Sequence, residues 1–212
     1  GIDARIRVVD AVQYDQRRIT FDFDMIQYRW DQSLSPGNEQ AFYWGSAAAA
    51  GRTHTDIPIL VSVTMETTGT MLLGSDMSAV MNALRPFPIA SLGLNCATGP
   101  TEMAEHVGAL SRHWDRAFSV IPNAGLPVLV DGRTEYPLRP DAFAAAMRRF
   151  LDESHANIVG GCCGTTYEHI RALRQAMGER RPQVTRAAVS TPGCSSLYNA
   201  VDFRQDNSFL IV

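Results

Sequence analysis

The sequence has no lysine, no long apolar run and no cluster of like charges; the first we interpret as genome composition, and the other two each exclude a class of function. Its 19 basic residues are all arginine, and 22 acidic residues bring the formal net charge to −3. This balance offers no basic face for nucleic acid and no polybasic segment for a membrane surface. No apolar stretch approaches the roughly 20 residues of a membrane span, and the first residues do not resemble a secretion signal. We therefore expect a cytoplasmic protein that binds neither nucleic acid nor membranes.

Cysteine is scarce too, since the 212-residue chain has four, and two of these are adjacent. Thiols stay reduced in the cytoplasm, where clustered cysteines are more often metal ligands or catalytic groups than disulfides. The pair Cys162 and Cys163 lies in NIVGGCCGTTYEHI, flanked by Gly160, Gly161 and Gly164. In a regular strand the two side chains would point to opposite faces, so the backbone must turn if both serve one centre. The glycines permit that turn.

From about residue 56, apolar runs alternate with amphipathic stretches. The runs typical of buried strands are IPILVSVTM (57–65), IASLGLNC (89–96), AFSVIPN (117–123), PVLVDG (127–132) and ANIVGGC (156–162). Between and after them, apolar residues spaced three, four and seven apart predict helices with one apolar face. Strand and helix recur roughly every 30 to 40 residues, which indicates βα units and a parallel sheet. Barrel and open sheet both fit this pattern, and RIRVVD (5–10) is a further candidate strand.

Three cysteines fall at predicted strand ends. Cys96 follows SLGLN and precedes ATGPTE, just as Cys162 and Cys163 follow a strand and precede a helix. The stretch TTYE resembles a capping box in which Thr165 is the N-cap and Glu168 reaches back. Ligands bind at this edge of parallel α/β folds, and three thiolates with an open fourth position are the arrangement of a catalytic zinc site. The alternative is that the cysteines are small buried hydrophobic residues.

The remaining candidates give weaker signals. Cys194 lies in a polar stretch with proline and glycine, and we do not expect it to join the other three. We interpret the five histidines as surface or helix-face residues, with His169 the one that comes nearest the site. The segment VTMETTGTMLLG (63–74) has two glycines but matches neither a P-loop nor a dinucleotide fingerprint.

Taken together, the motifs ILVSVTMETTGTMLLG, LGLNCATGP, PNAGLP and NIVGGCCGTT resemble the homocysteine-binding zinc domain of cobalamin-dependent methionine synthases. The resemblance covers about residues 47–212. It implies a (β/α)₈ TIM barrel of the α/β class. It also implies that the zinc ligands are Cys96, Cys162 and Cys163.

The same resemblance implies a set of substrate-binding positions around the zinc. They are Asn95 beside the first cysteine, Asn123 in PNAGLP, Thr64 and Glu66 at the preceding strand end, and Gly161. An asparagine at a strand end also serves as a turn-former, so either role is open for Asn95 and Asn123.

The activity that this resemblance implies is methyl transfer to homocysteine. Zinc would hold the homocysteine sulfur as a thiolate, which attacks the methyl group of methylcobalamin and gives methionine. The implied partners are homocysteine and the cobalamin-binding and folate-binding modules of the same polypeptide, one of which carries the cobalamin. Two alternatives are a non-catalytic zinc-binding fragment and a homocysteine methyltransferase that uses betaine or methylmethionine.

The chain departs from the family in its first part. A full barrel needs about 250 residues, and mainly the last four βα units are evident here. We expect residues 1–46 to be an unassigned remnant of the barrel's first half, in which only Asp10 matches the family's opening turn. Residues 47–180 would form the C-terminal half of the barrel, 181–207 a linker, and 208–212 (SFLIV) the start of the folate-binding module.

Overall fold

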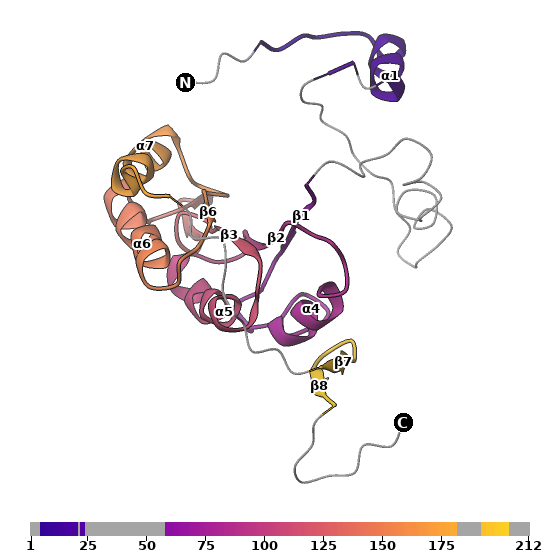
Figure 1. Cartoon of the computed structure of the whole chain (residues 1–212). Helices are drawn as coiled ribbons and strands as arrows, with labels where there is room; N and C mark the ends of the chain where they lie inside the picture. The colour runs from indigo at the N-terminus through magenta and orange to yellow at the C-terminus, as the bar shows by residue number, and fades with distance from the viewer. Residues whose placement is uncertain (1–4, 21, 24–57, 182–191, 204–212) are drawn as a thin grey trace. The chain divides into compact units, whose positions relative to one another are not determined.

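The structure, a computed structural model, describes residues 5–20, 22–23, 58–181 and 192–203 (Figure 1). The chain divides into two units, residues 1–56 and 57–212.

The described part of the first unit is one exposed helix, α1 (Ala11–Thr20), with no buried residue. Asp10 starts it, because its carboxylate accepts a hydrogen bond of 2.9 Å from the backbone N–H of Gln13. The prediction of a strand at 5–10 is wrong, since these residues have no regular structure. Ile6 and Val8 are 95% and 90% exposed, so their apolar side chains gain no burial that would favour an extended strand.

The second unit is built on a four-stranded parallel sheet of order β1-β2-β3-β6. Its strands are β1 (Leu60–Val63), β2 (Ser91–Asn95), β3 (Ala117–Ile121) and β6 (Ile158–Val159). The helices are α4 (Met77–Leu84), α5 (Pro100–His113), α6 (Pro140–Asp152) and α7 (Tyr167–Met177). All four helices lie along the same side of the sheet (Figure 1). The predicted α/β class and parallel sheet are confirmed.

The core fills the space between this sheet and its helices. Side chains alternate along a strand, so Leu92 and Leu94 of β2 face the helices together with Phe118 and Val120 in register on β3. All four are at most 1% exposed. Their buried partners on the helices include Val107, Leu110, Phe143, Met147 and Leu173. Burying this face fixes the register of the strands, and hence the positions of the residues that follow their carboxyl ends.

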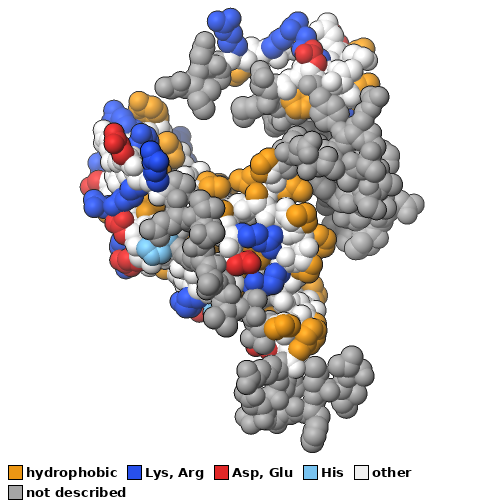
Figure 2. Space-filling view, viewed as in Figure 1, with side chains coloured by type: hydrophobic (Ala, Val, Ile, Leu, Met, Phe, Trp, Pro, Cys, Tyr) orange, Lys and Arg blue, Asp and Glu red, His pale blue; other side chains and the backbone are white. Residues whose placement is uncertain are grey.

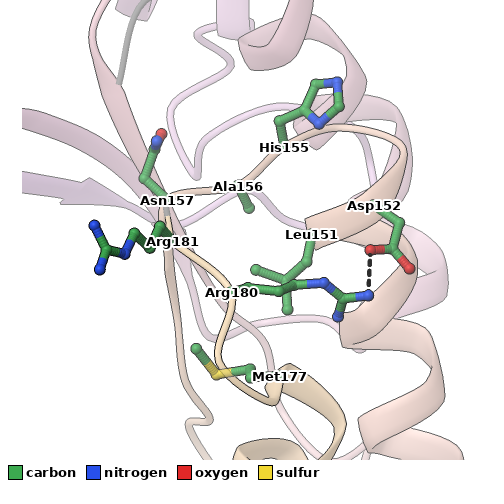
Figure 3. A pocket seen from close by; sticks show the side chains of 8 residues that line it. All are labelled: Leu151, Asp152, His155, Ala156, Asn157, Met177, Arg180 and Arg181. Atoms are coloured by element: carbon green, nitrogen blue, oxygen red, sulfur yellow. Dashed lines mark ion pairs between the residues drawn. The ribbon is translucent and has the colours of Figure 1, made fainter. Parts of the chain in front are cut away.

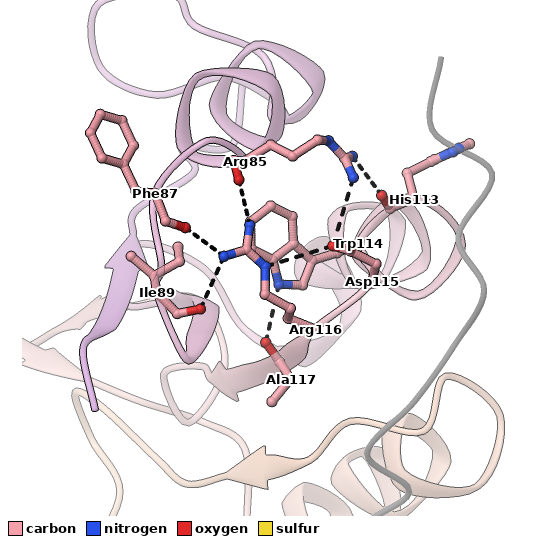
Figure 4. A network of polar contacts seen from close by, with 8 residues as sticks. All are labelled: Arg85, Phe87, Ile89, His113, Trp114, Asp115, Arg116 and Ala117. Atoms are coloured by element: carbon pink, nitrogen blue, oxygen red, sulfur yellow. Dashed lines mark hydrogen bonds and ion pairs between the residues drawn. The ribbon is translucent and has the colours of Figure 1, made fainter. Parts of the chain in front are cut away.

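A buried tryptophan packs at the amino end of β3, opposite the carboxyl edge of the sheet (Figure 4). Trp114 ends α5, is 1% exposed, and has the guanidinium groups of Arg116 and Arg85 at 4.5 and 5.7 Å from its ring centre. Arg116 also donates hydrogen bonds to the carbonyls of Arg85, Phe87 and Ile89, at 2.8, 2.6 and 3.2 Å. These carbonyls follow α4, so the arginine joins the end of one helix to the start of β3.

A strand forms within residues 127–132, as predicted, but the prediction that it is buried is wrong. Strand β4 (Val128–Val130) pairs antiparallel with β5 (Arg133–Glu135), and all six residues are exposed. Asp131 and Gly132 connect them with φ of 48° and 75°, the positive values that a two-residue type I′ turn requires. This hairpin stands apart from the parallel sheet, between β3 and α6 in the chain.

A second hairpin lies inside the stretch predicted as a linker. Strands β7 (Gly193–Ser195) and β8 (Ala200–Asp202) pair antiparallel. The turn between them docks before α4, where the backbone N–H of Asp76 donates to the carbonyl of Tyr198 at 2.8 Å. Ser75 Oγ donates to the carbonyl of Leu197 at 2.5 Å. Residues 192–203 therefore pack against the α/β unit.

Several large apolar side chains stay on the surface, where Figure 2 shows hydrophobic groups in orange. They include Ile59 and Leu60 at β1, which are 44% and 58% exposed, and Leu72 and Leu73, which are 84% and 73% exposed. Among the described helices, none is long and apolar enough to cross a membrane. The predicted strand start at 208–212 lies outside the described residues.

Candidate metal centre

Three thiols meet at the carboxyl edge of the sheet. Cys96 directly follows β2, and Cys162 and Cys163 follow β6 after two glycines. The Sγ separations are 2.9 Å for Cys96–Cys162, 3.5 Å for Cys96–Cys163 and 3.9 Å for Cys162–Cys163. Sulfurs that share a tetrahedral zinc with bonds of about 2.3 Å lie about 3.8 Å apart. The second and third separations are close to this value. Among the residues that the structure describes, no other group of three His, Cys, Asp or Glu comes so close together.

The backbone at Cys96 is strained. Cys96 and Ala97 have φ of 60° and 55°, so two successive residues other than glycine occupy the left-handed region. Such residues each cost roughly 1–3 kcal/mol and persist where the surroundings hold them. Here the N–H of Cys96 donates to Ile121 at 3.0 Å, and its carbonyl accepts from Thr98 at 2.6 Å. The strain turns the chain sharply at the end of β2, at the residue that supplies the first thiol.

The turn at the cysteine pair depends on two glycines. Gly164 has a φ of 75°, a value that favours glycine. A Cβ on Gly161 would lie 2.4 Å from the Thr165 side chain, so no larger residue fits there without a shift. Thr165 comes this close because its hydroxyl and its N–H both donate to the carbonyl of Cys162, at 2.6 and 3.2 Å. The N–H of Cys162 donates to Pro122 at 2.8 Å, which ties the turn to the end of β3.

Asn123 joins the two cysteine loops. It is 3% exposed, and its Oδ1 accepts a hydrogen bond of 3.1 Å from the backbone N–H of Cys163. Its own N–H donates to the carbonyl of Thr98 at 3.0 Å, and the next residue, Ala124, donates to the carbonyl of Cys163 at 2.9 Å. The structure thus brings this predicted site residue to the thiols, where its side chain holds the backbone of one of them.

Three polar side chains, Ser62, Thr64 and Asn95, are linked by hydrogen bonds on the sheet face opposite the helices. Asn95 accepts a 2.6 Å hydrogen bond from Ser62 Oγ at its Oδ1, and its Nδ2 donates to Thr64 Oγ1 at 3.4 Å. Ser62 was missed by the sequence reasoning, although its position two residues before Thr64 places both on one face. Glu66 starts a tight loop in which its N–H donates to Thr70 at 2.8 Å, and no hydrogen bond links its carboxylate to the cysteines.

The three thiols do not ionise alike. Hydrogen bonding from the Cys162 thiol lowers the pKa of Cys96 below its ordinary value, against the opposing effect of partial burial. Burial, and then the hydrogen bond to Cys96, raises the pKa of Cys162 to about 12. As the pH rises, Cys96 therefore loses its proton before Cys162 does. Cys162 keeps its proton and donates a hydrogen bond to the sulfur of Cys96. A divalent cation would favour the thiolate form of each cysteine.

His169 lies on the buried face of α7, so of the two predicted environments, surface or helix face, the second holds, and it has a structural role there. It is 7% exposed, and its Nε2 lies 2.8 Å from the carbonyl of Leu138, so Nε2 donates and Nδ1 accepts from the N–H of Thr166 at 3.1 Å. The N-cap of α7 is Thr166, one residue later than predicted, with His169 at the position expected for Glu168. Thr165 is unavailable as a cap because its hydroxyl bonds within the cysteine turn.

A cavity of about 320 Å³ lies elsewhere (Figure 3). Its lining includes Ala156 and Asn157, which precede β6, and Arg180, which forms an ion pair of 2.8 Å with Asp152. The cysteine pair follows β6. The cavity is therefore at the opposite end of that strand from the thiols and forms no part of their site.

Comparison with known proteins agrees with the motifs. Residues 39–177 match the family model described as Homocysteine S-methyltransferase. The methionine synthase of Mycobacterium tuberculosis is 49% identical over 169 residues, which cover 79% of this chain and 14% of that protein. The methionine synthase of Mycobacterium leprae is 46% identical over 172 residues, with the same coverage of 79% and 14%. The chain thus spans about one seventh of the length of these curated relatives.

Proposed function

Because this chain belongs to the homocysteine S-methyltransferase family, we propose that its converging thiols hold zinc and activate the sulfur of homocysteine for methylation. The observation that carries the proposal is the meeting of Cys96, Cys162 and Cys163 at one edge of the sheet. Three sulfur donors suit zinc, and three protein ligands leave a fourth position for substrate. When bound, zinc supplies the charge that keeps a thiol, with an ordinary pKa of about 8.5, as the nucleophilic thiolate near neutral pH.

The chain's own residues would prepare the site in two ways. The Asn123 side chain and the two glycines hold the cysteine pair in a turn, so that both sulfurs reach one centre. Asn95 and Thr64, held together with Ser62 on the face opposite the helices, offer polar groups next to Cys96. We assign Asn95, Thr64, Glu66, Asn123 and Gly161 to the substrate side of the centre. Gly161 fits beside Cys162 because its missing side chain leaves room for Thr165, whose hydroxyl donates to the carbonyl of Cys162.

The sheet itself is proposed to be an arc of a (β/α)₈ barrel. Two observations support this fold over a doubly wound sheet. The strand order follows the chain order without reversal, and the helices lie on one side (Figure 1). In such a barrel the face that carries Ser62 and Ser119 points inward.

The similarity to methionine synthases supports a more specific role. We propose that the methyl donor is methylcobalamin, that another module of the same polypeptide carries it, and that a folate-binding module follows residue 207. The product would be methionine. The cytoplasm is the proposed compartment, because the four cysteines are free and a thiolate centre needs reducing surroundings. A homocysteine methyltransferase with betaine or methylmethionine as donor is disfavoured by the same similarity.

X-ray absorption at the zinc edge tests this proposal. Zinc-loaded chain should show three sulfur neighbours and one lighter atom, and saturating homocysteine should replace the lighter atom with a fourth sulfur. Methionine, whose sulfur has no proton to lose, is the matched control and should leave the count at three. A sulfur count that homocysteine does not change would instead favour a non-catalytic zinc fragment.

A further inference from the structure

Tyr136 lies against the cysteine turn, although it belongs to a different part of the chain. It follows β5 of the exposed hairpin and comes 27 residues before Cys163. A Cβ built on Gly164 would lie 2.2 Å from Cγ and 2.3 Å from Cβ of Tyr136. The tyrosine therefore packs directly on the backbone of the residue after Cys163. Gly164 has two reasons to lack a side chain, this contact and its φ of 75°.

Backbone hydrogen bonds fix Tyr136 relative to Cys163. The N–H of Leu138 donates to the carbonyl of Ala124 at 3.0 Å, and the N–H of Ala124 donates to the carbonyl of Cys163 at 2.9 Å. His169 holds the other side of Leu138 through its carbonyl, at 2.8 Å. The hairpin is exposed, but the segment that leaves it is attached to the cysteine turn and to α7. The backbone two residues after Tyr136 is thus linked through Ala124 to the carbonyl of Cys163, next to the glycine on which the ring packs.

The phenol group is within reach of sulfur. Desolvation is the largest cause that raises the pKa of Tyr136 above its ordinary value, followed by a hydrogen bond to the Cys163 side chain and by the charges of the three cysteines. A phenol O–H is a donor and a thiolate sulfur an acceptor, so the hydroxyl of Tyr136 donates in this contact. Cys163 is the most exposed of the three thiols, so this donor stands where water would otherwise solvate its sulfur.

We propose that Tyr136 is a positioning residue of the thiolate centre, whose hydroxyl donates a hydrogen bond to Cys163 Sγ and holds that sulfur toward the other two. The inference rests on the proposed zinc site and adds a residue outside its ligands. A hydrogen bond to a ligand thiolate stabilises its charge and fixes its direction, and partners of this kind commonly change metal affinity by about 10- to 100-fold. The β4–β5 hairpin then has a function, because it positions Tyr136, which directly follows β5, next to Cys163.

The test compares Tyr136→Phe with the unchanged full chain in two measurements. Zinc affinity is measured by competition with a chromogenic chelator, and the cobalt-loaded chain gives the sulfur-to-cobalt charge-transfer spectrum. Removing only the hydroxyl should weaken zinc binding about 10-fold or more and move the charge-transfer band to lower energy, since the sulfur becomes more electron-rich. Tyr167→Phe, on the exposed start of α7, is the matched control and should change neither.

The outcomes separate this inference from the proposed function. If Tyr136→Phe has the zinc affinity and cobalt spectrum of the unchanged chain, the inference is overturned while the zinc site stands. If the unchanged chain binds no zinc, the proposed function fails and the inference fails with it. Gly164→Ala is a second variant that keeps the hydroxyl but pushes the ring off the backbone. It should weaken zinc binding in the same direction, and unchanged binding would count against the proposal.

Discussion

Cys162 Sγ lies 2.9 Å from Cys96 Sγ, although 66 positions separate the two residues in the sequence. Parallel strands bring their carboxyl ends to one edge, and this places the two residues near each other without making their sulfurs meet. The left-handed backbone at Cys96 and Ala97 and the glycine turn around the cysteine pair complete the approach. In this contact the Cys162 thiol donates to the sulfur of Cys96, so the two thiols should differ in reactivity in the metal-free chain.

In the metal-free chain, iodoacetamide should alkylate Cys96 well before Cys162. The thiolate is the reactive form. A lowered pKa gives Cys96 more thiolate at any given pH, whereas a pKa of about 12 keeps Cys162 protonated below that pH. Peptide mass spectrometry after short exposure at about pH 8 reads the order of modification. Faster labelling of Cys162 would reverse the assigned charge distribution.

Replacing Asn123 by alanine should destabilise the cysteine turn. The backbone N–H of Cys163 loses its acceptor, and an amide left unpaired in partly buried surroundings costs about 1–3 kcal/mol. Urea unfolding measures the loss, and zinc affinity should fall with it. Asn199→Ala, in the exposed β7–β8 turn, is the matched control. Equal stability of the two variants would show that the Asn123 side chain does not hold the turn.

Ser62→Ala should weaken homocysteine binding but not zinc binding. The hydroxyl of Ser62 donates to Asn95 at 2.6 Å, and its loss frees the asparagine side chain to rotate away from the proposed substrate position. A net hydrogen-bond contribution of about 0.5–1.5 kcal/mol corresponds to roughly 2- to 10-fold in affinity. Titration calorimetry on zinc-loaded protein gives the affinity. Loss of zinc from this variant would mean that Ser62 acts on the metal ligands instead.

Two glycines of one loop test how the β7–β8 hairpin is held. Gly69 and Gly74 have φ of 83° and 97°, so alanine is strained at either position. A Cβ on Gly74 would lie 3.0 Å from the Tyr198 ring, whereas nothing lies within 4 Å of one on Gly69. Gly74→Ala should therefore accelerate amide hydrogen exchange at residues 193–202 more than Gly69→Ala does. Equal exchange in both variants would argue against docking through Tyr198.

Periodicity in the sequence predicted the parallel sheet and its helices, because buried strands and amphipathic helices must repeat their apolar residues at fixed spacings. It failed at 127–132, where three apolar residues look the same in a buried strand and in an exposed hairpin. The Asp131–Gly132 dipeptide was the available signal for a hairpin, since this pair favours a type I′ turn.

The approach of Cys96 to the cysteine pair could be predicted from their places at strand ends. Ser62 and Tyr136 could not be found in this way. The role of Ser62 depends on the register between β1 and β2, which pairs it with Gly93, two residues before Asn95. The role of Tyr136 depends on a long-range contact with Gly164, for which the sequence has no local pattern. The cap of α7 was misplaced by one residue because two adjacent threonines offer the same hydroxyl.

Zinc content of single cysteine-to-serine variants tests the account most directly. Elemental analysis should find one zinc per chain in the unchanged protein and in Cys194→Ser, because Cys194 lies exposed on the β7–β8 hairpin. Serine at position 96, 162 or 163 removes one of three sulfur ligands and should abolish stoichiometric zinc. Full zinc in any of these three variants, or its loss in Cys194→Ser, would contradict the three-thiolate centre.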